Sequence, residues 1–535
     1  MSPKSSRSLA GIAGIVALAT LISKVFGLFR EQAIAAAFGV GPVVNAYAYA
    51  YVIPGFLLIL LGGINGPFHS ALVSALSKRE QEEAAPIVET VTTLVSVILI
   101  GVAIGLVVFA PQMIDVLAPG LNTSTRELAI LQLQIMAPLA VLAGLIGIGF
   151  GTLNAADQYW LPSVSPLFSS VALIAGMGLL IAYLGDQVAA PEYVRLGGMV
   201  LAGGTLAGGI LQWIAQVIAQ WRSGLGTLRL RFDWRIPGVR DVLKVMLPAT
   251  LSSGMLHINV YTDLFFASAI AGAAAAMRYA NFIVLTPVGI LSNMILVPLL
   301  PVFSRLAEPE QWPELKVRIR QGLLLTALTM LPLTAIFMSL SVPIIRIIYE
   351  RFAFDAKAST LVAPVLMAYG FGMFFYLGRD VLVRVFYALG DGETPFRISI
   401  ANILLNAGLD YVLVNAFQTP GLVMATVGVN LVSMVIFLAI LHHRLQGLPL
   451  WEWGGLLLGL ILSSVVAGAA SWVTSLAWER YLGNDNFLLL LGELLTGSAI
   501  AILIFLGLAW QLRLPELQIL LQRVSQKLGR KRSKG

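Results

Sequence analysis

Runs of about 20 apolar residues recur from one end of the chain to the other, and no other feature restricts its fold as strongly. A hydrocarbon core of about 30 Å is crossed by roughly 20 helical residues, so each run can span a bilayer. Hydrophobic residues make up 58% of the sequence and charged residues 11%, against roughly 25% charged in soluble domains. The sequence therefore predicts an all-α integral membrane protein with about fourteen transmembrane helices. The predicted spans lie near residues 9–36, 42–76, 87–110, 128–152, 161–184, 196–219, 244–271, 278–303, 318–342, 360–388, 396–416, 420–441, 453–477 and 487–511.

The distribution of Lys and Arg predicts the orientation of these spans. With the N-terminus in the cytoplasm, twenty-three of the 34 cationic residues fall in cytoplasmic segments and seven on the opposite side. Cytoplasmic loops are the ones that carry an excess of Lys and Arg. Both termini are therefore expected in the cytoplasm. The basic tail is then a topology signal beside an anionic leaflet, not a nucleic-acid site.

The order of the spans predicts four parts of the chain. The seventh span follows a large basic loop much as the first follows the N-terminus, which suggests two six-helix lobes at 1–220 and 221–445. Two further helices occupy 446–512, and a basic cytoplasmic tail occupies 513–535.

An intramembrane enzyme, such as a polyprenyl-phosphate glycosyltransferase, is a remote alternative to a transporter. Such enzymes need an acid–base cluster, and usually a metal-binding acidic motif in a sizeable extramembrane region. No loop here exceeds roughly 26 residues, the four histidines are scattered, and cysteine is absent. Prolines within the spans and 51 glycines are typical of bent, closely packed transporter helices. We therefore expect a transporter and no enzyme.

Three charged residues interrupt the first span. Lys24, Arg30 and Glu31 lie in an otherwise apolar stretch, although a charge at bilayer depth costs roughly 2.5–3.5 kcal/mol or more. In one interpretation Arg30 and Glu31 lie at the outer interface, where long side chains reach water. In the other, the cations line a water-filled cavity that receives an anion. Lys24 is about fifteen residues into the span, too deep to reach water easily.

Oxygen-bearing side chains in three later spans form a second polar set. Asp263 lies midway along the seventh span, Asn406 and Asp410 are one turn apart on the eleventh, and Thr426 lies on the twelfth. Carboxylate, amide and hydroxyl oxygens are the ligands that a hard cation such as Na⁺ prefers. The alternative is that Asn406 and Thr426 join packed helices by hydrogen bonds.

A third polar set lies at the end of the tenth span. Arg379, Asp380 and Arg384 share one helix, with Arg384 four residues after Asp380, and Gly390 and Pro395 mark the following turn. This pattern fits a hairpin at the cytoplasmic edge with an internal ion pair, or a contact with an anionic ligand.

Several ordered motifs over nearly the whole chain resemble the MurJ (MviN) family of lipid II flippases, within the multidrug/oligosaccharidyl-lipid/polysaccharide exporter superfamily. They are "SKVFGLFREQAIAAAFG", "AYAYVIP", "APG", "GTLNAADQYWLPSVSP", "PVGILSNMILVPLLPVFSR" and "FYALGDGETP". The resemblance implies a bacterial inner-membrane protein that flips undecaprenyl-pyrophosphate-linked peptidoglycan precursor outward by alternating access during cell-wall biogenesis. It also implies a cationic central cavity, and a groove for the lipid tail at the two extra C-terminal helices. We expect a monomer whose partners are lipid II and membrane lipids, with no nucleic acid.

The resemblance also implies roles for individual residues. Arg30 and Glu31 match a family arginine and its acidic neighbour, and Lys24 lies where the family has another arginine. Arg278 and Arg384 are candidates to replace cations that this chain lacks. The family's sodium-site positions fall on Asp263, Asn406, Asp410 and Thr426, with Leu422 contributing a backbone carbonyl.

The sequence departs from the family pattern at four positions. Leu58 and Phe282 lie where the family has arginines, and Asn45 and Asn281 lie where it has acidic residues. Much of the family's cationic headgroup site is therefore missing, so a different polyprenyl-linked oligosaccharide or an amphiphile remains an alternative cargo. The residues also leave the coupling energy open between Na⁺, H⁺ and the membrane potential.

Overall fold

The computed structural model describes residues 9–63, 66–76, 81–226, 228–236, 238–244, 246, 250, 259–484 and 486–517. In these ranges the chain forms α-helices, short 3₁₀ helices and connecting turns, with no β-strand. Eleven of the described helices are long and apolar enough to cross a membrane. The all-α membrane fold is therefore confirmed, whereas the number fourteen stays a prediction.

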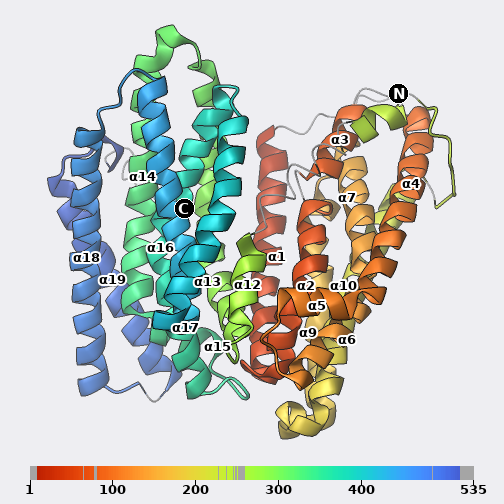
Figure 1. The fold of residues 1–535 in the computed structure, drawn as a ribbon, viewed down its shortest axis with the longest axis horizontal. Coiled ribbons are helices and arrows are strands. Elements are labelled where there is room, and N and C mark those ends of the chain that lie inside the picture. Colours follow the sequence, from red (N-terminus) through yellow and green to blue (C-terminus); the bar gives the residue numbers. More distant parts are fainter. Residues whose placement is uncertain are drawn as a thin grey trace, which may run out of the picture. The chain divides into compact units, whose positions relative to one another are not determined.

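The chain divides into two compact units (Figure 1). Unit 1 comprises residues 1–275 together with the segment 351–355. This division is one of spatial clustering, and the predicted lobes at 1–220 and 221–445 stay a prediction. The α-helices of unit 1 with both ends described are α1 (Leu9–Phe38), α2 (Pro42–Leu60), α3 (Pro67–Leu76), α4 (Gln81–Val108), α5 (Ala110–Leu117), α6 (Thr123–Met136), α7 (Leu139–Ala155), α8 (Trp160–Val164), α9 (Pro166–Leu184), α10 (Val194–Arg222) and α12 (Asn259–Ala267).

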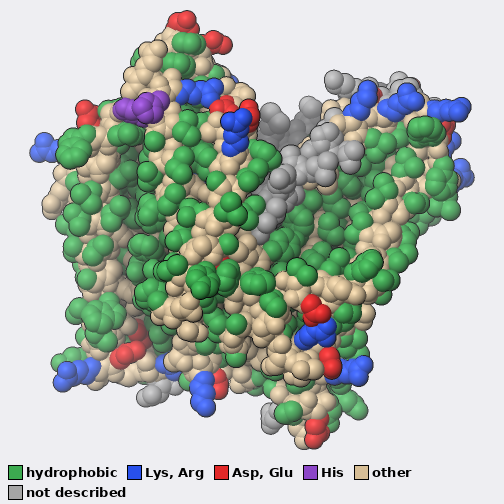
Figure 2. All heavy atoms as spheres, in the orientation of Figure 1, with side chains coloured by type: hydrophobic (Ala, Val, Ile, Leu, Met, Phe, Trp, Pro, Cys, Tyr) green, Lys and Arg blue, Asp and Glu red, His purple; other side chains and the backbone are tan. Residues whose placement is uncertain are grey.

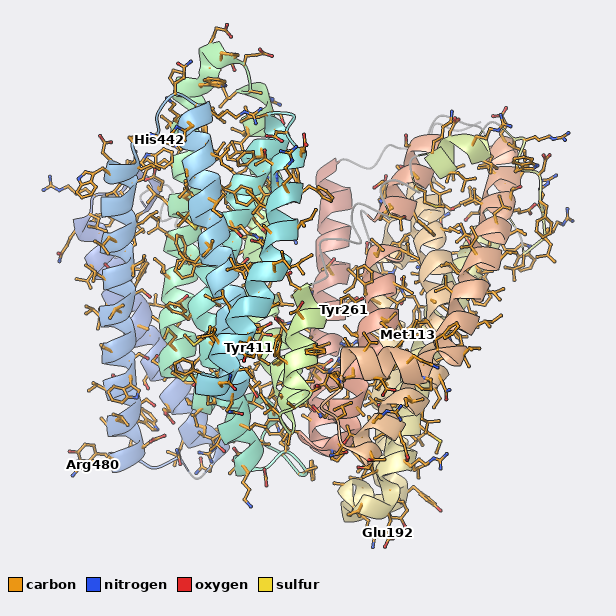
Figure 3. The ribbon with its side chains drawn as sticks, in the orientation of Figure 1. Met113, Glu192, Tyr261, Tyr411, His442 and Arg480 are labelled. Atoms are coloured by element: carbon orange, nitrogen blue, oxygen red, sulfur yellow. The ribbon has the colours of Figure 1, made fainter. Side chains whose placement is uncertain are left out.

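Unit 2 comprises residues 276–350 and 356–535. Its first helix, α13, begins at Ala273, so its first turn clusters with unit 1. Figure 3 shows His442 and Arg480 at opposite ends of this unit, so α18 carries the chain from one end to the other. The α-helices are α13 (Ala273–Arg305), α14 (Trp312–Ser339), α15 (Ser341–Tyr349), α16 (Ala356–Ala388), α17 (Glu393–Arg444), α18 (Leu450–Tyr481) and α19 (Phe487–Gln511).

The predicted second span, 42–76, is two helices. Helix α2 continues through Pro54 and ends at Leu60, and α3 begins at Pro67. The amide of Gly62 still donates to the carbonyl of Leu58 at 3.0 Å, so the helical hydrogen bonds continue just past the end of α2. The chain thus leaves the helix at Gly62–Gly63 and not at Pro54.

The predicted eleventh and twelfth spans are the two limbs of α17. Gln418, with φ of 53°, has non-helical backbone angles inside this element, in the left-handed region that is uncommon for a residue with a side chain. Ser433 bonds to Asn402 across the limbs at 2.9 Å, and a methyl group on Gly421 would overlap the carbonyl of Leu413. The limbs therefore pair antiparallel from the reversal onward, as a helical hairpin without a loop.

Helix α7 packs closely against α2 and α3 in unit 1. A Cβ at Gly147 would overlap the backbone carbonyl of Leu61, and one at Gly151 would lie 2.8 Å from Cβ of Leu72. Backbone atoms cannot move aside as a flexible side chain can. Small residues at helix contacts are what allow such close approach within membranes.

We predict that Gly147→Ala destabilises the protein, because the added methyl group forces α7 away from the end of α2. Overpacking of this kind costs about 1–3 kcal/mol. Gly178→Ala is the matched control, because its Cβ would meet nothing within 4 Å on α9 and alanine favours a helix. Thermal unfolding of the purified variants measures both effects. A Tm of Gly147→Ala equal to that of Gly178→Ala would contradict the close approach.

Candidate functional site

The charged residues of the first span lie on α1. Lys24 is exposed. The Nε and Nη2 atoms of Arg30 donate to Oε1 of Glu31 at 3.2 and 2.9 Å. The Arg30 side chain is 26% exposed, whereas that of Glu31 is 2% exposed. The buried carboxylate thus holds one edge of the guanidinium, whose five N–H donors leave others for an anion.

Two further predicted residues lie on α12 and α13. Asp263 is buried on α12 in unit 1, and Arg278 is half-buried on α13 in unit 2. Asn45, at a position where the family has an acid, is buried and accepts a hydrogen bond from the amide of Ala275 at 3.4 Å. Asn45 thereby satisfies an N–H in the first turn of α13, which would otherwise need another acceptor.

The predicted oxygen ligands of unit 2 come together across the α17 hairpin. Asn406 and Asp410 are fully buried, and Nδ2 of Asn406 donates to Oδ2 of Asp410 at 2.9 Å. Oγ1 of Thr426, on the opposite limb, lies 3.5 Å from Oδ1 of Asn406. Leu422 is also buried, one turn before Thr426. Tyr411, the next residue after Asp410, is 67% exposed (Figure 3).

This cluster continues into a longer polar network. Asn430 donates from Nδ2 to the carbonyl of Thr426 at 2.9 Å, and its Oδ1 accepts from Nη1 of Arg379 at 2.7 Å. Arg379 in turn pairs with Asp380 at 2.7 Å and lies over the ring of Tyr376. The network therefore joins α16 to both limbs of α17 and contains a cation as well as carboxylates.

The tenth span contains an internal ion pair. Asp380 pairs with its neighbour Arg379 and not with Arg384, four residues on. Arg384 is half-buried on α16, and its role toward an anion stays a prediction.

No conventional transition-metal site is present in the described ranges. They contain no group of three or more His, Cys, Asp or Glu side chains that could hold a metal ion. The unit 2 cluster instead offers three possible oxygen ligands. The carboxylate of Asp410 and the amide of Asn406 lie on one limb of α17, and the hydroxyl of Thr426 lies on the other. Such a donor set fits a hard cation better than a soft one.

The turn before α17 explains the motif "GDGETP". Asp391 accepts from the amide and hydroxyl of Thr394 at 3.0 and 2.8 Å, and from Nη1 of Arg444 at 2.5 Å. Partial burial would raise the pKa of Asp391, but the hydrogen bonds from Thr394 and Arg444 hold this pKa below its usual value. Asp391 thus ties the first turn of α17 to its last residue.

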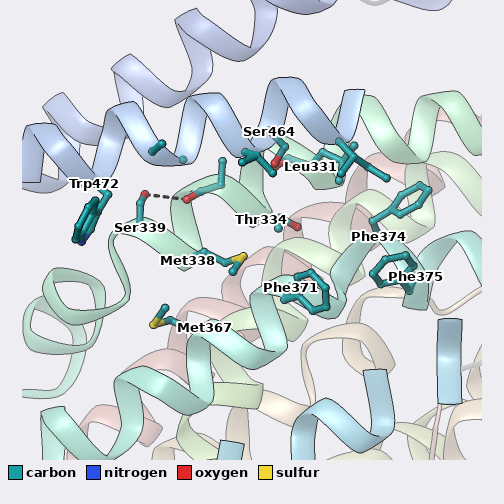
Figure 4. A pocket seen from close by; sticks show the side chains of 15 residues that line it. Leu331, Thr334, Met338, Ser339, Met367, Phe371, Phe374, Phe375, Ser464 and Trp472 are labelled. Atoms are coloured by element: carbon teal, nitrogen blue, oxygen red, sulfur yellow. Dashed lines mark hydrogen bonds between the residues drawn. The ribbon is translucent and has the colours of Figure 1, made fainter. Parts of the chain in front are cut away.

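An apolar cavity of about 430 Å³ lies between α14, α16 and α18 in unit 2 (Figure 4). Its hydroxyl groups are engaged by the protein, since Ser464 donates to the carbonyl of Leu331 and Thr334 to that of Gly370. Met338, Phe371 and Trp472 also line the cavity. The cavity can therefore hold a hydrocarbon group but offers little to a charged one.

Glu493 is a buried carboxylate outside the predicted sites. It lies on α19, is 1% exposed, and accepts a hydrogen bond from Ser475 on α18. A single Glu inside the apolar run 487–511 is a visible signal, because ionisable groups within spans are rare and usually paired.

Comparison with known proteins identifies the family to which this chain belongs. A family model described as "Lipid II flippase MurJ" matches residues 34–492. A probable lipid II flippase MurJ from Synechocystis sp. is 63% identical over 533 residues, which cover 99% of this chain and 100% of that protein. The chain belongs to the MurJ lipid II flippase family. A lipid II flippase MurJ from Burkholderia cenocepacia is 28% identical and covers 81% of this chain and 84% of its own length.

Solved structures agree on the fold. A lipid II flippase MurJ in an inward closed conformation superposes with a TM-score of 0.74 at 23% identity, covering 92% of this chain and 97% of that one. An inward-facing multidrug transporter of the MATE family follows, with a TM-score of 0.62 at 15% identity, covering 81% and 98%. At these identities the likeness concerns the fold alone.

We predict that Asp391→Ala lowers stability by about 1 kcal/mol, because an N–H of the first turn of α17 and Arg444 both lose an acceptor. Glu393→Ala is the control, since its ion pair with Arg397 is 70–75% exposed and such pairs contribute little. A carboxyl group with a lowered pKa stabilises the fold above its unfolded pKa of about 3.9, and this contribution is lost as the pH falls. The difference in Tm between Asp391→Ala and the parent should therefore shrink below about pH 4. Equal Tm values of Asp391→Ala and the parent at neutral pH would contradict a stabilising role of Asp391.

Proposed function

We propose that this protein is a lipid II flippase, which moves undecaprenyl-pyrophosphate-linked peptidoglycan precursor from the inner to the outer leaflet by alternating access. The observation that carries the proposal is the 63% identity to a probable lipid II flippase over the full length of both chains. The all-helical fold, the long apolar helices and the cations on α1 all suit the movement of an amphiphilic anion.

Within this proposal Arg30 and Lys24 bind the pyrophosphate. Arg30 keeps N–H donors beyond the edge that Glu31 holds, and a guanidinium binds phosphate oxygens through paired hydrogen bonds. Glu31 fixes the orientation of Arg30. Arg278 and Arg384 are proposed to supply further positive charge, in place of the arginines missing at Leu58 and Phe282.

The apolar cavity of unit 2 is proposed to take part of the polyprenyl tail. Its lining is aromatic and aliphatic, and its hydroxyl groups already bond to the protein. A hydrocarbon chain loses little by leaving lipid for such a surface, whereas a sugar or phosphate would lose its hydration. Helix α18, which forms one wall, belongs to the predicted pair of extra C-terminal helices.

We also propose that Na⁺ binds to the unit 2 cluster and biases the transport cycle. Asp410, Asn406 and Thr426 provide oxygen donors there, with the carbonyl of Leu422 as a further ligand. A bound cation would neutralise the buried carboxylate. Asp263 belongs to the other unit, and its part in this site stays a prediction.

The remaining proposals concern the setting of the protein. We propose that the protein lies in the bacterial inner membrane and acts as a monomer. The distribution of Lys and Arg supports a cytoplasmic position for both termini. A flippase or exporter for another polyprenyl-linked oligosaccharide or for an amphiphile is the alternative. The likeness to a MATE-family transporter concerns the fold alone. Depletion that leaves lipid II exposure unchanged while another surface polymer is lost would favour that alternative.

The function is tested by Arg30→Ala, which we expect to abolish complementation of a flippase-depleted strain while the protein still folds. Because Arg30 also neutralises Glu31, the double variant Arg30→Ala/Glu31→Gln separates the two roles. If Arg30 binds pyrophosphate, the double variant stays inactive. Recovered growth in the double variant would reduce Arg30 to a partner of Glu31. Normal growth with Arg30→Ala alone would remove the proposed anion site.

The cation site is tested by thermal unfolding in Na⁺ and K⁺ at equal ionic strength. Na⁺ should raise the Tm increasingly as its concentration passes the Kd, because a ligand that binds only the folded protein stabilises it by about 2.7 kcal/mol at about 100 times its Kd. Asp410→Asn should remove the difference between the salts. Glu493→Gln is the control, since it removes a buried carboxylate of unit 2 outside the cluster. Equal stabilisation by both salts, or an Na⁺ effect that survives in Asp410→Asn, would contradict the site.

A further inference from the structure

An exposed segment of alternating character follows α10 in unit 1. Residues 228–235, here called the interfacial segment, read LRLRFDWR and contain no helix. Every second side chain is apolar and open to the surroundings: Leu228, Leu230, Phe232 and Trp234 are 62%, 83%, 60% and 61% exposed. In an extended chain successive side chains point to opposite faces, so Leu228, Leu230 and Phe232 share one face. The chain turns at Trp234, whose amide donates to the carbonyl of Phe232 at 3.0 Å.

The interfacial segment is joined to α4 by a hydrogen bond and an ion pair. The amide of Arg231 donates to Oγ1 of Thr93 at 3.1 Å, and its Nη1 lies 3.6 Å from Oε2 of the buried Glu89. The flanking residues Leu225 and Val239 are buried, and Val239 joins the apolar core of α3 and α4. The exposed apolar face is therefore held in place by protein contacts on both sides.

Positive charge surrounds this face. Six cations lie between residues 222 and 244, against two carboxylates, at Asp233 and Asp241. Figure 2 shows Lys and Arg side chains gathered at the end of unit 1 near α4. The cations are Arg222, Arg229, Arg231, Arg235, Arg240 and Lys244.

We propose that the interfacial segment lies in the headgroup layer of an anionic leaflet, with its apolar face inserted and its arginines on lipid phosphates. Trp and Phe at the level of the headgroups are typical of membrane interfaces, and nearby basic residues attract anionic lipid. The segment also adjoins a helix with exposed apolar side chains of its own, since Val97 and Ile98 of α4 are 55% and 65% exposed. A bilayer would therefore cover both the apolar face of the segment and the exposed apolar side of α4.

The insertion is tested in the full chain, which has no cysteine of its own. Single variants Leu230→Cys and Phe232→Cys are labelled with a small fluorophore, with Arg229→Cys and Asp233→Cys as controls from the other face. The proteins are placed in nanodiscs of phosphatidylglycerol and phosphatidylcholine. Lipid-borne nitroxide should quench labels at 230 and 232 several-fold more than those at 229 and 233, and aqueous acrylamide should do the reverse. Equal quenching at all four positions would overturn the insertion.

The lipid charge is tested separately by Arg229→Gln/Arg235→Gln. Apparent affinity for phosphatidylglycerol, read from the rise in Tm as its fraction in the nanodisc increases, should weaken by roughly fivefold for each arginine lost. Arg195→Gln/Arg480→Gln is the matched control, because these exposed arginines lie in segments predicted on the opposite side. An unchanged phosphatidylglycerol dependence in the first double variant, or an equal loss in the second, would overturn the headgroup assignment.

Discussion

Every backbone N–H and C=O within a bilayer must find its partner inside the protein, because hydrocarbon offers none. The rest of this structure depends on that requirement. It explains why the long apolar segments of the described chain are helical, and why the departures from helix within them are so short. At Gly62 the helical hydrogen bond to Leu58 persists beyond the end of α2, and at Gln418 the chain reverses while the helices on either side continue. Where the backbone must bend, it gives up as few internal bonds as possible.

The same requirement governs polar side chains. In unit 2, Asp410, Asn406, Thr426, Asn430 and Arg379 follow one another through contacts that cross from α17 to α16. A buried charge is costly unless it is paired and hydrogen-bonded, so such a network holds its helices in one register. Burial also makes the network sensitive to a single added cation, because a charge in surroundings of low dielectric constant interacts strongly with every polar group nearby.

Much of this fold is readable in the sequence. The length of each apolar run predicts a helix, and the contacts of Asn406, Asp410 and Thr426 within unit 2 follow from helical spacing and antiparallel spans. Three features were not predictable in the same way. Pro54 and Gly62–Gly63 both permit a break, and only packing decides between them. Asp380 has arginines at two usable spacings, and the side-chain rotamers select Arg379. Glu493 was visible as a charge in an apolar run but had no partner in sequence, because Ser475 is on another helix.

The hairpin of α17 has a consequence for how the protein is made. Its two limbs follow each other without a loop, and Asn402 meets Ser433 only 31 residues later in the chain. Contacts so near in sequence form early, because little chain entropy is lost in closing them. The limbs can therefore enter the membrane as one preassembled pair, with Asn406 and Thr426 already facing each other before α18 is synthesised. The polar residues of each limb, which would be costly to insert into lipid alone, would then be hydrogen-bonded to each other already when the limbs enter the membrane.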